Sequence, residues 1–143
     1  MPIMPKSLML APLVKSITPC IEAINNADLI ILGPGSFLTS IVPPLLVRDI
    51  SNALANRKGH CVFIDNVVAE NSPAAALSLD ERFAWIEDNI GCLPVDSVIC
   101  QDPAIKSDRA HIICRDLAHN KVPHHHDKRK LIKALEECLA NIR

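Results

Sequence analysis

The sequence has few aromatic side chains and no tyrosine: only 3% of its 143 residues are aromatic. Proteins that hold single-stranded nucleic acid stack the bases on aromatic rings, and this chain has few rings to build such a surface. Its net charge is -1 and its pI is about 6.6, so no basic field attracts a phosphate backbone. We therefore expect no nucleic-acid partner.

Long apolar runs, closely spaced cysteine pairs and a basic leader are also missing. No apolar stretch is long enough to cross a bilayer. Near the start, the single basic residue Lys6 precedes a short apolar run that Pro12 interrupts, which is not a signal-peptide pattern. The six cysteines form no CxxC pair. These absences predict a cytoplasmic protein, away from membranes, whose cysteines are small buried apolar residues.

Short apolar runs alternate with longer amphipathic stretches along the chain, of which 49% is hydrophobic. The runs predict strands at residues 7–10, 29–32, 61–64, 95–100 and 111–114. The amphipathic stretches predict helices at residues 16–26, 43–56 and 79–89, and a last helix after residue 127. Alternating strands and helices indicate βαβ units. We therefore expect a single α/β domain over residues 1–143, a Rossmann-like three-layer sandwich with a mostly parallel sheet.

Several residues mark the expected ends and positions of these elements. Ser16 is predicted to cap the first helix and Asp127 the last, while Ser78 and Glu81 have the spacing of a capping box. The run Leu29–Leu32 is apolar at every position and contains two β-branched residues. That pattern is typical of a strand in the middle of a parallel sheet, buried on both faces.

Ligands of such sheets bind at the carboxyl ends of the strands, which directs attention to residues 33–40, 65–72 and 101–106. The first segment holds Gly33, Gly35 and Ser36 between an expected strand and helix. Two glycines let the backbone turn sharply near a ligand, and the free N–H groups that follow favour an anion, so a phosphate or pyrophosphate is the natural ligand. Because neither GxGxxG nor a P-loop is present, an ordinary strand-to-helix turn stays equally open.

Polar residues also follow the next expected strand. Asn66 and Glu70 are candidates for hydrogen bonds to a sugar, a base edge or a metal-bound water. Such residues also make Asx-turns and caps routinely, and from the sequence alone that interpretation is favoured.

The segment 123–127 contains three consecutive histidines before Asp127. Adjacent side chains rarely all face one ion and Asp127 is explained as a helix cap, so we expect no metal site. A single histidine, His126, is expected to point into the ligand cleft. No nucleophilic triad is evident because no GxSxG elbow exists. Asp65 and Glu70 are the only loop carboxylates that fit acid/base work, and catalytic residues stay unassigned.

Several blocks together resemble one known family. The text ADLIILGPGSFLTSIVP over residues 27–43 is similar to the ADLI-x-x-GPGS-x-YTS-x-x-P block of the gluconeogenesis factor family, the YvcK/YbhK type of the CofD-like superfamily. Asn66, Glu70 and the SPAAA run from Ser72 resemble a second block. Asp96 before a strand and the pair His126-Asp127 followed by Leu131 resemble others. One departure is Leu38, where the family usually has tyrosine.

The resemblance covers nearly the whole chain from about Leu8 and implies the C-terminal half of a CofD-like fold. Members of the family are about twice this length, so we expect that a glycine-rich half is missing here. The resemblance implies a nucleotide-sugar ligand of the UDP-N-acetylglucosamine type and no certain cofactor. It places the ligand against these residues: Gly33, Pro34, Gly35, Ser36, Thr39, Ser40, Asn66, Glu70 and His126.

Three hypotheses follow for the function. The first is a regulatory, nucleotide-sugar-binding gluconeogenesis factor that links carbon metabolism to cell-wall synthesis and cell shape. The second is a transferase of the 2-phospho-L-lactate (CofD) type. The third is a structural half with no ligand of its own, and exposed apolar surface then favours a homodimer.

Overall fold

A computed structural model describes residues 3–142 of the chain. Its four strands form one parallel sheet in the order β1-β2-β3-β4. They are β1 (Leu29–Leu32), β2 (His60–Ile64), β3 (Ser97–Cys100) and β4 (His111–Cys114). The predicted strands at residues 29–32, 61–64, 95–100 and 111–114 are therefore confirmed within three residues, whereas residues 7–10 form no strand.

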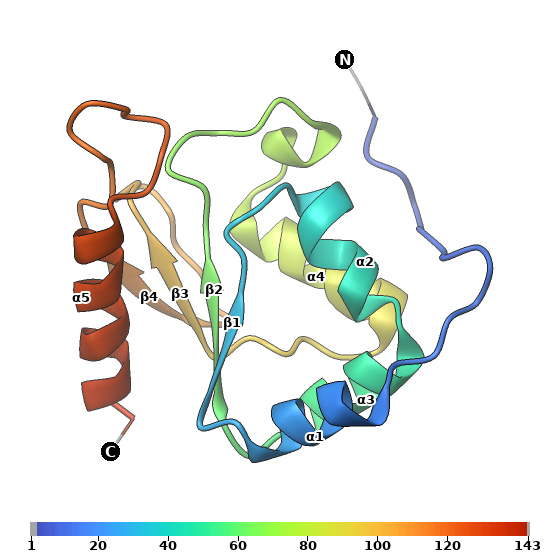
Figure 1. Ribbon diagram of the computed structural model, residues 1–143. Coiled ribbons are helices and arrows are strands. Elements are labelled where there is room, and N and C mark those ends of the chain that lie inside the picture. The colour runs from blue at the N-terminus through green and yellow to red at the C-terminus, as the bar shows by residue number, and fades with distance from the viewer. Residues whose placement is uncertain (1–2, 143) are drawn as a thin grey trace.

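Helices cover both faces of the sheet (Figure 1). On one face lie α1 (Thr18–Asn26), α2 (Val42–Leu45), α3 (Arg48–Ala55) and α4 (Leu79–Ile90), with a π-helical turn η1 (Phe37–Ile41) and a 3-10 turn η2 (Pro73–Ala76). On the other face, α5 (Lys128–Ala140) is the single helix of the described residues. The expected three-layer α/β sandwich is thus confirmed.

Alternating side chains along the strands divide the core into two clusters. Phe63 and Val98 face the larger helical layer, where they pack among residues such as Phe83. Val62 and Ile99 face the other way, against Ala134 and Cys138 of α5. This period of two is what a strand buried on both faces requires, so β2 and β3 are the central strands.

The prediction that Leu29–Leu32 is a central strand is wrong for the described residues. β1 pairs only with β2, in parallel register from Leu29 opposite His60 to Leu32 opposite Phe63. It is an edge strand, and Ile31 is 45% exposed. Its sequence has the composition of an interior strand although its position in the sheet is peripheral.

Two helix predictions also need correction. Ile17, not Ser16, occupies the N-cap of α1, and the Ser16 backbone N–H instead donates to Asp49 at 3.2 Å. The single helix expected at residues 43–56 is divided into α2 and α3. The division falls at Val47, whose backbone is extended. Because position 47 is neither glycine nor proline, the apolar periodicity did not indicate that the helix is interrupted there.

Other end signals are confirmed. Ser78 and Glu81 form both hydrogen bonds of the capping box that starts α4. The Asp127 carboxylate accepts hydrogen bonds from the backbone N–H groups of Arg129 and Lys130 at the start of α5. Within residues 3–142, no helix is long and apolar enough to cross a membrane.

Candidate functional site

The loop between β1 and η1 lies at the carboxyl end of the sheet, as predicted. Gly33 has φ +84°, a left-handed conformation that glycine adopts without strain. Phe37, only 1% exposed, packs edge-to-face on Trp85 with ring centroids 5.9 Å apart and fixes the end of the loop in the core. Within residues 3–142, the backbone N–H groups of Gly35 and Ser36 have no acceptor. Backbone N–H groups without a protein acceptor are what an anion-binding loop requires.

Two polar residues of the loop after β2 hold this first loop in place. Asn66 donates from Nδ2 to the Gly35 carbonyl at 3.3 Å. Both carboxylate oxygens of Glu70 accept from the Phe37 backbone N–H at 3.2 Å. The segments predicted separately at the ends of two strands thus meet, because β1 and β2 are neighbours. The Asx-turn and cap interpretation, favoured from the sequence, does not describe these long-range contacts.

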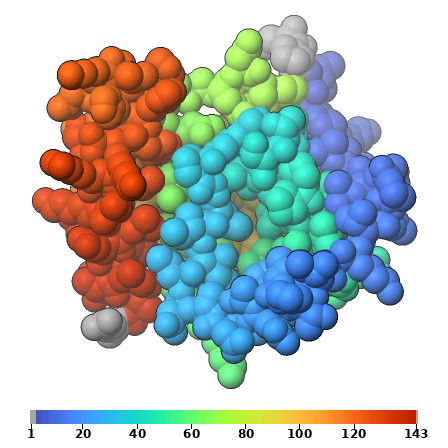
Figure 2. All heavy atoms as spheres, viewed as in Figure 1, coloured from blue at the N-terminus to red at the C-terminus, as the bar shows by residue number. Residues whose placement is uncertain are grey.

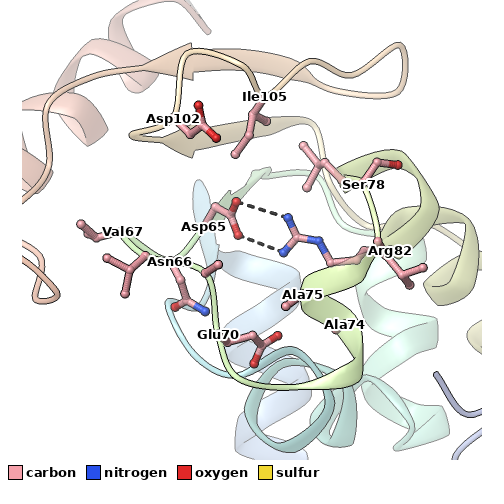
Figure 3. A pocket seen from close by; sticks show the side chains of 14 residues that line it. Asp65, Asn66, Val67, Glu70, Ala74, Ala75, Ser78, Arg82, Asp102 and Ile105 are labelled. Carbon is pink, nitrogen blue, oxygen red and sulfur yellow. Dashed lines mark hydrogen bonds and ion pairs between the residues drawn. The ribbon is translucent and has the colours of Figure 1, made fainter. Parts of the chain in front are cut away.

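A buried ion pair lies beside these residues (Figure 3). Arg82 of α4 donates to both oxygens of Asp65 at the end of β2, at 2.9 and 3.2 Å. The two side chains are 14% and 9% exposed. The Arg82 guanidinium also lies 6.0 Å from the Phe63 ring centroid. Its Nε is buried and has no acceptor among the described residues.

The Asp65–Arg82 ion pair and the loop after β2 line an open cavity of about 260 Å³. Its polar lining includes Asp65, Asn66, Glu70, Arg82 and Asp102. Figure 3 shows that Asp102 and Ile105, from the connection between β3 and β4, face Asp65 and Arg82 across it. Asn66 and Glu70 line this cavity and also hold the glycine loop, so the cavity and the loop form one candidate site. Carboxylates, an amide and a guanidinium around such a space suit the hydroxyl groups of a polar ligand.

His126 reaches the same end of the sheet from the segment before α5. Its Nε2 donates to the Asp65 carbonyl at 3.1 Å. The preceding rings of His124 and His125 contact each other edge-to-face instead. Among residues 3–142, no group of three or more His, Cys, Asp or Glu side chains is placed to hold a metal ion.

The remaining predicted residues lie on another side of the loop. Gly33 and Ser40 line a second, apolar groove of about 230 Å³ beside β1. Pro34 and Thr39 are exposed. A Cβ placed on Gly35 would lie 2.8 Å from the Ser40 Cβ, so the glycine allows close packing against η1.

Asp102 lies in the segment 101–106 to which the sequence directed attention, although the residue itself was not singled out, whereas Arg82 was missed. Arg82 lies near the start of α4, one residue after the capping-box glutamate, and nothing in the sequence connects it with Asp65 seventeen positions earlier. Close to the site, burial raises the pKa of the Cys100 thiol to about 12, with Cys114 and Asp65 adding to the effect. This thiol stays protonated and is a packing residue rather than a nucleophile.

Together the fold and this candidate site define an α/β protein in which a glycine-containing loop follows the first strand of a parallel sheet. The family described as 2-phospho-L-lactate transferase CofD matches residues 3–141, so the chain belongs to the CofD family. The chain is 39% identical to a protein of Yersinia pestis and 37% identical to one of Pasteurella multocida, both provisionally named gluconeogenesis factors. Each alignment covers 97% of this chain and 46% of the relative.

A solved structure shows the same fold. It is a member of the UPF0052 family from Bacillus halodurans, 24% identical, which superposes with a TM-score of 0.77. The match covers 90% of this chain and 49% of that protein. The chain therefore spans about half the length of the relatives it matches, as the resemblance implied.

Proposed function

We propose that the chain binds a nucleotide sugar of the UDP-N-acetylglucosamine type and acts as a regulatory protein of the gluconeogenesis factor kind. One observation supports this most directly. The free backbone N–H groups of Gly35 and Ser36 lie in a loop that Asn66 and Glu70 join to a polar cavity of about 260 Å³.

Each part of the ligand has a matching part of the site. The N–H groups of Gly35 and Ser36 would bind phosphate oxygens, with the Ser36 hydroxyl as a further donor. Glu70 already occupies the Phe37 N–H, so the phosphate is confined to the earlier part of the loop. The cavity has room for one sugar ring, whose hydroxyl groups would bond to Asn66 and Asp102.

Regulation is proposed because of the relatives. The name gluconeogenesis factor belongs to the whole proteins of Yersinia pestis and Pasteurella multocida. This chain matches 46% of the length of each. In this proposal, ligand binding reports the supply of nucleotide sugar and adjusts cell-wall synthesis and cell shape to the carbon source. The role concerns the whole protein of which the matched region is a part.

Calorimetric titration with UDP-N-acetylglucosamine tests the ligand, with GDP as the comparison. We expect saturable binding of the sugar nucleotide and at least tenfold weaker binding of GDP. Asn66→Ala should weaken binding about tenfold, whereas Asn52→Ala, at an exposed position on α3, should leave it unchanged. Equal binding of both ligands, or equal effects of the two substitutions on binding, would contradict the proposal.

A second candidate is a transferase of the 2-phospho-L-lactate type, which the description of the matching family favours. The same loop would then hold a phosphate while charge develops on it. Incubation with a guanosine diphospho-lactate donor and a deazaflavin acceptor tests this. Formation of a phospholactyl product would establish the transferase, and its absence with a full-length relative would exclude it.

A further inference from the structure

The outer edge of β1 is open and carries none of the usual protection of an edge strand. On one side β1 pairs with β2, and on the other no described strand pairs with it. Natural edge strands are shielded by charges, prolines or bulges, because their free N–H and C=O groups recruit other strands. The sequence of β1, Leu-Ile-Ile-Leu, has no such residue. The opposite edge strand, β4, starts with the exposed His111.

Both faces of the sheet next to this edge are also apolar and incompletely covered. On the α5 side, Ile31 is 45% exposed because α5 covers the strands farther along the sheet. On the other side, an apolar groove of about 230 Å³ runs beside β1, between α1 and the α2–α3 region. Ile24, Ile30 and Pro44 contribute to its lining. Figure 2 shows the light-blue atoms of this region at the surface, between red α5 and the teal helices.

These features resemble the interior of a larger sheet whose next strand and covering helices are not among the described residues. An apolar strand needs a neighbour for its backbone, and Ile31 and the groove need apolar side chains from two layers. A lone helix would leave the edge unpaired, and a lone strand would leave both apolar faces bare. Only an α/β segment supplies a parallel strand together with helices on both sides.

The relatives show how much chain is available for this purpose. This chain matches 46% of the Yersinia pestis relative and 49% of the Bacillus halodurans structure. In both, a segment as long as this chain lies outside the match, which is enough for a second α/β unit of similar size.

We propose that β1 is the docking edge for an α/β segment of the kind that forms the unmatched half of these relatives. The segment adds a strand parallel to β1, and its helices cover Ile31 and fill the groove beside Ile30. The edge serves equally a segment in the same polypeptide or in another one. Because Gly33–Ser40 follows β1 directly, the added strand turns this loop into the wall of a crevice between two strands, where ligands of such sheets bind.

Co-expression tests the edge without using any ligand. The chain is produced together with a tagged segment comprising the part of the Yersinia pestis relative that this chain does not match. We expect a 1:1 complex by light scattering, and slower hydrogen exchange of the outward-pointing amides of residues 29–32 in the complex. Ile31→Lys should weaken the complex at least tenfold. Ile132→Lys is the matched control, because Ile132 is 46% exposed but lies on α5, and it should leave the complex intact.

A fused chain removes the dependence on assembly of two pieces. If the co-expressed segment is not recovered, the same segment is joined to this chain in one polypeptide and exchange is measured again. Exchange at residues 29–32 as fast as in the chain alone would overturn the proposal, as would equal effects of Ile31→Lys and Ile132→Lys. So would a homodimer of the chain alone that Ile31→Lys dissociates, since the occupant would then be a second copy.

Discussion

Both carboxylate oxygens of Glu70 lie 3.2 Å from the backbone nitrogen of Phe37, thirty-three positions earlier in the chain. The contact joins the loop after β2 to the loop after β1. Phe37 itself is buried against Trp85, so the carboxylate meets a part of the loop that the core already holds. Glu70 therefore determines how the two loops of the candidate site are spaced.

Removing the Glu70 carboxylate should loosen the glycine loop. Glu70→Ala leaves the part-buried Phe37 N–H without its acceptor, and we expect a loss of about 1–2 kcal/mol in the free energy of unfolding. Glu70→Gln keeps an acceptor oxygen and should lose less than half as much. Urea unfolding measures both, and hydrogen exchange at Phe37 should accelerate only in Glu70→Ala. Equal losses would mean that the charge, not the hydrogen bond, matters.

The ion pair between Asp65 and Arg82 should behave as a coupled unit. Either partner alone would be a nearly buried charge, so Asp65→Ala and Arg82→Ala should each cost about 3–5 kcal/mol. The double variant should be less destabilised than the sum of the two, because it leaves no unpaired charge. A double-mutant cycle by urea unfolding measures this coupling. Additive losses would show that the two charges do not stabilise each other.

The sequence predicted the sheet well because its strands are short apolar runs whose composition depends little on context. The sequence-based prediction placed β1 in the middle of the sheet because an apolar composition indicates that a strand is suited to burial. Composition does not indicate whether a neighbouring strand is present. Leu29–Leu32 is apolar on both faces, yet one edge is open in the described residues. The error and the proposed docking edge thus have the same physical origin.

The candidate site was predictable only in part. Gly33, Asn66 and Glu70 were identified because turn-forming and polar residues directly follow apolar strands. Arg82 was not, since an arginine on an amphipathic helix is normally solvated and its contact with Asp65 depends on how α4 packs. The hydrogen bond from Asn66 to Gly35 likewise follows from strand order, which local patterns do not contain.

Gly35 and Ser40 provide a test of loop packing. A Cβ on Gly35 would lie 2.8 Å from the Ser40 Cβ, so Gly35→Ala should destabilise the protein by about 1–3 kcal/mol. The double variant Gly35→Ala/Ser40→Gly removes the opposing atom and should recover most of that loss, although glycine at position 40 has its own entropic cost. Thermal unfolding measures the recovery. If the double variant is less stable than Gly35→Ala alone, contact between these two atoms is not the reason for the glycine.

Asp96 should make stability depend on pH at the opposite end of the sheet. Its carboxylate accepts hydrogen bonds from the Cys61 backbone N–H at 2.8 Å and from Arg57 at 2.6 Å. Partial burial on its own raises the pKa of Asp96, but these hydrogen bonds, with the charges of Arg57 and His60, outweigh it and leave the pKa below its usual value. A depressed folded-state pKa stabilises the protein above the unfolded-state pKa, and this contribution disappears as the pH falls through the folded-state value.

Asp96→Asn should therefore lower the melting temperature at pH 7. The difference from the unaltered protein should begin to shrink below about pH 4, the usual pKa of an unfolded aspartate, and should vanish once the pH has fallen through the lower folded-state pKa of Asp96. Thermal unfolding between pH 7 and pH 2.5 measures the difference. Asp88→Asn, at an exposed position of α4, controls for loss of one negative charge and should change the melting temperature little at any pH. A difference for Asp96→Asn that stays constant or grows in acid would mean that side-chain shape at this position stabilises the fold, because a contribution from the ionised carboxylate must vanish once it is protonated.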